Sequence, residues 1–193
     1  MSRFALLLVA AALVGTPALA DPVSVTRFIA ADAAPTHGTY AVTTTPGIDP
    51  TSLEQRPWLD AVAHSLAGLG FTPSADTNPD FVVEVHVERQ TRHIDRAHPP
   101  VSVGMAGESG TYHSGFGMGV GFTLGGGPKD LVTTHLVVTV RERASGRPLW
   151  EGRADNTENA HGKRGGIDIA APRLAQAVFT GFPGKSGETI TVK

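Results

Sequence analysis

The stretch FVVEVHVERQ, at residues 81–90, alternates apolar and polar side chains through most of its length. One face carries Phe81, Val83, Val85 and Val87, and the other carries Val82, Glu84, His86 and Glu88. Because successive side chains of a strand point to opposite faces, this pattern predicts a β-strand with one buried face. Residues 131–143 repeat the alternation, and the turn at 144–147 leads into a further apolar stretch at 148–155. The region 131–155 is therefore predicted to be an antiparallel hairpin.

Two amphipathic segments are predicted to cover the apolar side of this sheet. Val62, Leu66 and Leu69 recur at helical spacing after residues 51–55, whose hydroxyl and acidic or amide side chains fit a capping box. A second helix is predicted from about residue 166 to 180, starting near Asp168 because Pro172 is poorly tolerated further inside. With two more strands at 24–30 and 38–45, the expected fold is α+β, an antiparallel sheet with two helices packed on one face.

The first twenty residues have the pattern of an export signal. Arg3 supplies a basic start, an apolar run follows at 4–14, and small residues end the segment at Ala20. This run is too short for a membrane span, and the chain has no cysteine to accept a lipid or form a disulfide. We therefore expect residues 1–20 to be removed, leaving one domain over 21–193 that is periplasmic or secreted, with no transmembrane segment and no lipid anchor.

The charge balance argues against a nucleic-acid partner. The chain has 16 Lys and Arg against 18 Asp and Glu, a net charge of −2, and the basic residues form no stripe. Its hydrophobic content of 40% is enough for a folded core, so the composition does not predict disorder.

A glycine-rich insertion lies between the predicted strands, at about 101–127. Glycine recurs at alternate positions from Gly115 to Gly121, which weakens a strand and is typical of a bend or an excursion from the sheet. Phe116, Met118 and Phe122 fall on the face opposite these glycines, where no internal partner is assured. These three residues are the predicted binding surface, for an envelope protein or for a second copy of the chain.

The histidines provide an alternative hypothesis, a metal-binding protein. His86 and His135 lie on the polar faces of predicted strands and His93 lies close to the glycine-rich insertion, so the three are candidate ligands. The chain contains no pair of histidines at the spacing of a zinc-binding helix, and no other cofactor motif is found.

No catalytic motif is found in the sequence. The chain has no G-x-S-x-G elbow, and the adjacent His64 and Ser65 diverge by about 100° on a helix, too far to act as base and nucleophile. The expected function is non-enzymatic binding or envelope assembly. A hydrolase with a dispersed site would instead require a deep pocket with convergent polar groups.

The order of these segments resembles a bacterial envelope family known as domain of unknown function 4136. The resemblance is carried by Arg27-Phe28, by Gly38-Thr39-Tyr40-Ala41, by Gly68-Leu69-Gly70-Phe71, by Asn78 to Val83, and by Ser145 to Ala154. Two features depart from the family pattern: Val42 stands where tryptophan is common, and the lipid-accepting cysteine of many members is absent. The resemblance implies an α+β domain in the envelope of a Gram-negative bacterium, and it implies no activity or functional residue.

Overall fold

Seven strands form one sheet in the computed structural model, which describes residues 22–30, 34–75, 78–94 and 129–193. The strands are β1 (Val23–Ile29), β2 (Thr39–Thr44), β3 (Thr72–Pro73), β4 (Phe81–Ile94), β5 (Lys129–Glu142), β6 (Pro148–Asn159) and β7 (Thr189–Val192). The helices are α1 (Arg56–Gly68), the short 3-10 helix η1 (Lys163–Gly165) and α2 (Ile167–Phe179). The strand order is β3-β2-β4-β5-β6-β1-β7, so β1 and β2 lie in opposite halves of the sheet.

The expected simple antiparallel sheet is wrong, because the sheet is mixed. β2 runs parallel to both β3 and β4, whereas β4, β5, β6, β1 and β7 pair antiparallel in turn. The cause is α1, which returns the chain from the end of β2 so that β4 starts beside the start of β2. Parallel strands cannot be joined by a tight hairpin and need a longer crossover connection, usually a helix, which α1 supplies here. The overall α+β class holds.

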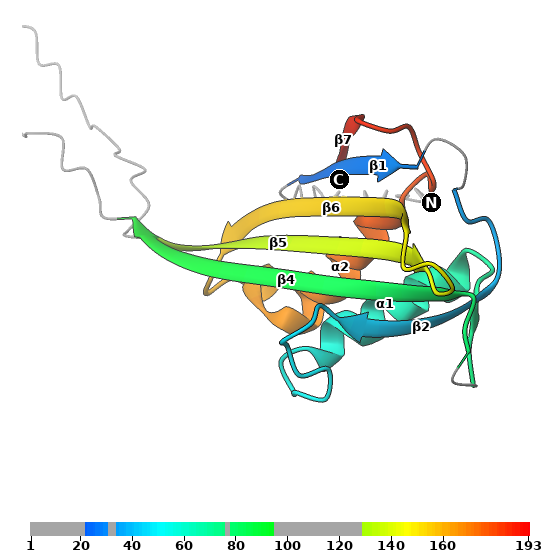
Figure 1. Cartoon of the computed structure of the whole chain (residues 1–193). Helices are drawn as coiled ribbons and strands as arrows, with labels where there is room; N and C mark the ends of the chain where they lie inside the picture. The colour runs from blue at the N-terminus through cyan, green and yellow to red at the C-terminus, as the bar shows by residue number, and fades with distance from the viewer. Residues whose placement is uncertain (1–21, 31–33, 76–77, 95–128) are drawn as a thin grey trace, which may run out of the picture.

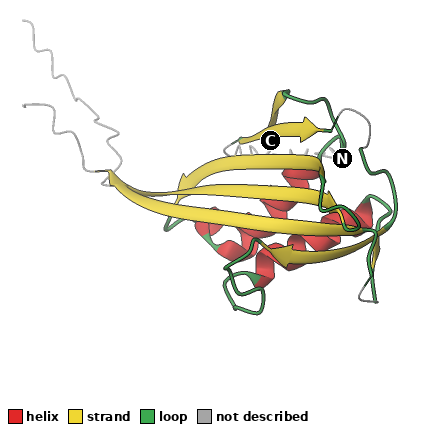
Figure 2. Ribbon diagram, viewed as in Figure 1, coloured by secondary structure: helices red, strands yellow, loops and turns green. Residues whose placement is uncertain are grey.

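The three central strands agree with the alternation in the sequence. β4 pairs with β5 from Phe81↔Glu142 to Ile94↔Lys129, and β5 pairs with β6, as the predicted hairpin requires. Figure 1 shows α1 and α2 together behind the sheet, with α1 near β2 and β4 and α2 near β5 and β6. Figure 2 shows in colour the strands lying together in front of the two helices.

The core lies between the sheet and the two helices. Its largest fully buried side chains are Trp58, Trp150, Leu66, Leu136 and Leu174. The N-cap of α1 is Gln55, four residues after Thr51, the first capping-box position, and Pro57 lies in the first turn. Leu69 lies just beyond the end of this helix and outside the core, where it is 37% exposed.

Gly152 allows α2 to approach β6 closely. A Cβ atom at this position would lie 2.3 Å from Cη2 of Trp150 and 2.6 Å from Cγ2 of Val178. Trp150 stacks on Phe179 with ring centroids 5.3 Å apart. The absence of a side chain at residue 152 therefore makes room for the tryptophan ring under the helix.

The predicted export signal and the glycine-rich insertion lie outside the described residues. Residues 1–20 and 101–127, with Phe116, Met118 and Phe122, are not among them. In the part that the structure does describe, no helix combines the length and the apolar character needed to cross a membrane.

Candidate functional site

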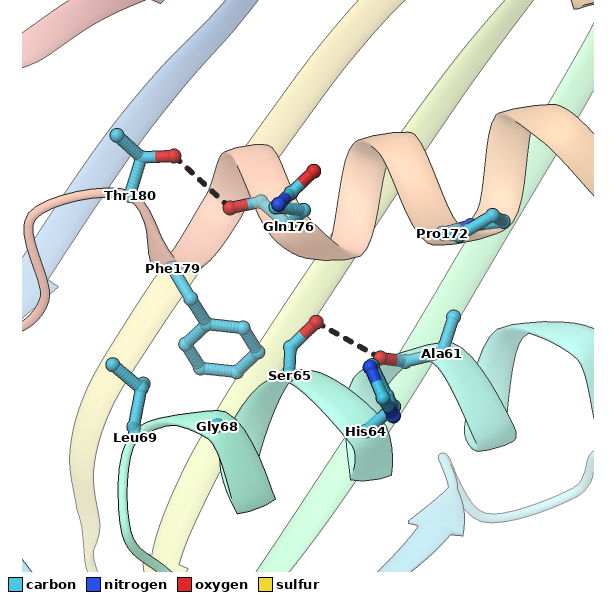
Figure 3. A pocket seen from close by; sticks show the side chains of 9 residues that line it. All are labelled: Ala61, His64, Ser65, Gly68, Leu69, Pro172, Gln176, Phe179 and Thr180. Carbon is cyan, nitrogen blue, oxygen red and sulfur yellow. Dashed lines mark hydrogen bonds between the residues drawn. The ribbon is translucent and has the colours of Figure 1, made fainter.

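A groove with a volume of about 520 Å³ lies between the outer sides of α1 and α2. Figure 3 shows it lined by side chains of both helices. The lining residues are Ala61, His64, Ser65, Gly68 and Leu69 from α1 and its end, and Pro172, Gln176, Phe179 and Thr180 from α2 and its end. None of these side chains carries a fixed charge, so the groove suits a neutral and mostly apolar ligand.

Small side chains on α1 leave the space for the groove. Ala61, Ser65 and Gly68 recur at intervals of four and three residues, which places them along one flank of the helix. Leu69 forms part of the rim just beyond the helix end, and the buried Phe179 lines the groove from α2. The two helices therefore pack closely at their sheet-facing sides and leave a trough on their outer sides.

The polar atoms of the groove fall into two kinds. The hydroxyl of Ser65 donates to the carbonyl oxygen of Ala61 at 2.9 Å, and that of Thr180 donates to the carbonyl oxygen of Gln176 at 3.0 Å. The side chains of His64 and Gln176 are exposed and make no hydrogen bond with the described residues. These two side chains at the rim are thus available to a ligand that brings its own donors and acceptors.

The open face of the sheet is covered by paired charges. Arg141 Nε donates to Glu84 Oε2 at 2.8 Å, His135 Nδ1 lies 2.5 Å from Asp155 Oδ1, and Arg153 Nη2 lies 2.7 Å from Glu151 Oε1. His86 Nε2 lies 3.1 Å from Glu88 Oε1 and its Nδ1 lies 3.3 Å from Thr45 Oγ1. These contacts are typical of a solvated sheet face.

The structure does not bring the three candidate metal ligands together. His86 and His135 share the open face, whereas His93 lies an odd number of residues from His86 on β4 and so points to the opposite face. Across the described ranges, no three His, Asp or Glu side chains form a group that could hold a metal ion. Strand alternation alone separates His93 from the other two.

His93 instead belongs to a polar cluster at the far end of the helix-covered face. Its Nδ1 contacts Oδ1 of Asp130, and Nε2 of His161 lies 2.7 Å from Oδ2 of the same carboxylate. Hydrogen bonds from His93 and then from His161 lower the pKa of Asp130. Further along this face, the buried Glu158 forms an ion pair with Arg173 of α2.

Two other buried polar groups stabilise the helices. The guanidinium of Arg27 donates to the carbonyl oxygens of Val178 and Thr180 at the end of α2. Its burial lowers its pKa, an effect that the nearby Glu188 opposes. The hydroxyl of Tyr40 donates to the carbonyl oxygen of Ala63 in α1 at 2.8 Å, and burial raises its pKa. These residues serve the fold and do not line the groove.

The sequence alone does not predict the groove. Helical spacing places Leu69 on the core stripe of α1, and His64 and Ser65 are considered only as a catalytic pair, which that spacing excludes. The available signal is the run of small residues at 61, 65 and 68, which indicates a flank of α1 that a bulky neighbour or a ligand can approach.

Comparisons with known proteins relate the chain to one family and one fold. The family model described as "Domain of unknown function (DUF4136)" matches residues 26–184. A Zymomonas mobilis protein described as uncharacterized protein ZMO1243 is 38% identical over 77 residues, which is 39% of this chain and 29% of that protein. The chain thus matches less than a third of the length of this curated relative.

Two solved structures are similar to the chain. A PDZ domain protein from Parabacteroides distasonis superposes with a TM-score of 0.52 at 14% identity, covering 89% of this chain and 39% of that one. This likeness concerns the fold alone. The PelC dodecamer from Paraburkholderia phytofirmans gives a TM-score of 0.42 at 11% identity, covering 85% of this chain and 99% of that one.

Proposed function

The chain belongs to the DUF4136 family, and we propose that it is an exported, non-enzymatic binding protein whose α1–α2 groove holds an apolar segment of another envelope protein. The observation that carries this proposal is the uncharged groove of about 520 Å³ between two packed helices. Grooves of this size and character are the usual form of sites for apolar ligands. A segment that lays apolar side chains between two helices is also a recurring mode of peptide recognition.

The rim favours a polypeptide over a lipid chain. Peptide groups that approach the groove need hydrogen-bond partners, because a desolvated peptide group without one costs free energy. The side chains of His64 and Gln176 each provide a donor and an acceptor at the edge of an otherwise apolar surface. An acyl chain has no use for these groups.

The hydrogen bonds of Ser65 support binding over catalysis. Its hydroxyl donates to the carbonyl oxygen of Ala61, one turn earlier in α1, instead of to the adjacent His64 ring. A serine nucleophile must donate to a base before it attacks. The Ser65 hydroxyl therefore lines the groove without being activated as a nucleophile.

The binding experiment uses a neutral apolar dye, N-phenyl-1-naphthylamine, and the purified protein. We expect saturable binding near one dye per chain, which Gly68→Trp abolishes because an added side chain there meets open space and fills the groove. The matched control is Ala67→Trp, one residue away on α1 and outside the groove lining, which should bind as wild type does. Equal binding by both variants would place the dye elsewhere and contradict the proposal.

A second arm separates polypeptide from lipid. A capped, uncharged Leu-Phe-Leu peptide should displace the dye. Gln176→Leu should weaken binding of the peptide about two- to thirteenfold and leave binding of the dye unchanged, since one hydrogen bond contributes about 0.5–1.5 kcal/mol. Displacement by decanol but not by the peptide would assign the groove to acyl chains.

Export rests on the pattern of residues 1–20 and has its own test. Protein recovered from the periplasmic fraction of a Gram-negative host is expected to begin at Asp21. A full-length chain that stays in the cytoplasm would contradict this part of the proposal without affecting the groove.

A further inference from the structure

The outer edge of β4 has no neighbouring strand among the described residues beyond Val85. β2 pairs with β4 only from Phe81 to Val85, whereas β5 follows β4 on the other side as far as Ile94. Figure 1 shows β4 continuing well past the end of β2. Along residues 86–94, alternate backbone N–H and C=O groups of β4 are therefore directed away from the sheet.

This edge is exposed and charged. Glu88 and residues 90–94 are exposed, and Ile94 keeps 45% of its surface accessible. The guanidinium of Arg92 makes no hydrogen bond or ion pair with the described residues. Charged side chains commonly protect an edge strand from pairing. Here, however, a negative charge at Glu88 and a positive charge at Arg92 lie on the same face of β4, with Gln90 between them.

The order of these charges is complementary to itself. Glu88, Gln90 and Arg92 occupy alternate positions and so share the open face of the sheet. When a second β4 runs antiparallel about a two-fold axis through Gln90, Glu88 of each copy lies opposite Arg92 of the other. Moving the axis by one residue, to Arg89 or Thr91, places Glu88 opposite Gln90 or Ile94 instead. Opposite charges across a strand pair stabilise it, so the charges select a single register.

We propose that two copies of this chain associate edge to edge through residues 86–94 of β4, antiparallel and with Gln90 on the two-fold axis. The interface joins the two sheets into one continuous sheet and supplies two Glu88–Arg92 pairs. A closed two-fold arrangement of this kind uses the same surface on both copies and cannot extend into a fibre.

The charges also decide between a second copy and the chain's own glycine-rich insertion as the occupant. Among the acidic and basic residues Asp, Glu, Lys and Arg, residues 101–127 contain only Glu108. In one copy the Glu88 carboxylate contacts Nε2 of His86 at 3.1 Å. Residues 101–127 offer no lysine or arginine to add to this contact, whereas a second β4 places an Arg92 opposite each Glu88. The proposal therefore commits to the second copy.

Sedimentation velocity of the purified protein over a range of concentrations tests the association. We expect a reversible dimer, and we expect Glu88→Arg and Arg92→Glu each to raise the dissociation constant at least tenfold, because each places like charges opposite one another twice. The double variant Glu88→Arg, Arg92→Glu exchanges the two charges and should restore the dimer. Arg143→Glu, in the turn between β5 and β6, makes the same charge change away from the edge and should leave the dimer intact.

The absence of cysteine allows a direct test of the register. An antiparallel pair on a two-fold axis has Cα atoms about 4.5–5.5 Å apart, within the range of a disulfide. Gln90→Cys should thus form a covalent dimer on mild oxidation, much faster than Arg143→Cys.

Three outcomes would each overturn the proposal: a wild-type protein that is monomeric at all concentrations, failure of the charge exchange to restore the dimer, or equal oxidation of the two cysteine variants. A monomeric Gln90→Cys variant whose new thiol resists alkylation would overturn it as well, and would assign the edge to the chain's own residues.

Discussion

The two ends of the helix-covered face are built from the same three strands but have opposite character. Near the start of β6, Trp150 stacks on Phe179 and contacts Phe182, and Phe71 meets Phe81 edge to face with ring centroids 6.2 Å apart. Near the end of β6, the face carries the Glu158–Arg173 ion pair. Apolar burial at the first end needs no partner of defined geometry, whereas each buried charge at the second end needs its counterpart.

Truncation of the aromatic end should have the largest effect on stability. Trp150→Ala removes a side chain that is 1% exposed, together with its hydrogen bond from Nε1 to the carbonyl oxygen of Pro183 at 3.0 Å. We expect the free energy of unfolding to fall by about 3–5 kcal/mol, measured by urea denaturation. Phe28→Ala, at an aromatic residue that is 41% exposed, is the control and should cost far less. Equal losses would show that the aromatic cluster is not the centre of the core.

At the polar end, Glu158→Gln should have the next largest effect. The amide keeps the shape of the side chain but removes the negative charge that faces Arg173, and Glu158 is 7% exposed. We expect a loss of about 1.5–3 kcal/mol in the free energy of unfolding, the usual range for a hydrogen bond to a charged group. Glu151→Gln, in the exposed pair with Arg153, should cost below about 1 kcal/mol. If the two variants are equally stable, the Glu158 pair behaves as a surface pair and the contrast between the two ends is lost.

Gly152→Ala tests how tightly the aromatic end is packed. The new methyl group would overlap Trp150 and Val178, so the ring or the helix must move. Overpacking of this kind costs about 1–3 kcal/mol. Gly68→Ala adds the same methyl group to open space in α1, where it should stabilise the helix by about 0.5–1 kcal/mol. If Gly152→Ala leaves the urea midpoint unchanged, the tryptophan ring has room to shift.

The apolar end could be predicted from the sequence and the polar end could not. Alternation assigns Val83, Val85 and Leu136 to a buried face because their side chains are apolar. The same alternation places Glu158 and Arg27 on that face, but a charged residue is expected at the surface unless its partner is known. Arg173 and the carbonyl groups at the end of α2 lie far from them in sequence, so their pairing is fixed only by the fold.

The strand order and the groove could not be predicted from the sequence for a related reason. The helix at 56–68 could be read from its periodicity, but the sequence does not show that it connects two parallel neighbours, β2 and β4. The groove depends on the distance between α1 and α2, and thus on side chains such as Phe179 that belong to another part of the chain. Separation of His93 from His86, in contrast, follows from strand alternation and was available from the sequence.

The smallest expected effect concerns Asp130, at the exposed tip of the polar end. Hydrogen bonds from His93 and His161 lower the pKa of this carboxyl, so the folded protein holds it ionised more strongly than the unfolded chain does. The resulting stability is present above the unfolded pKa, about 3.9, and is lost as the pH falls through the lower folded value. Urea midpoints measured from about pH 5 to pH 2 should therefore fall less steeply for Asp130→Asn than for wild type. Asp60→Asn, which removes a carboxyl of α1 with no hydrogen-bond partner among the described residues, should reproduce the wild-type slope. A wild-type slope for Asp130→Asn would leave the Glu158–Arg173 pair as the main source of stability at the polar end.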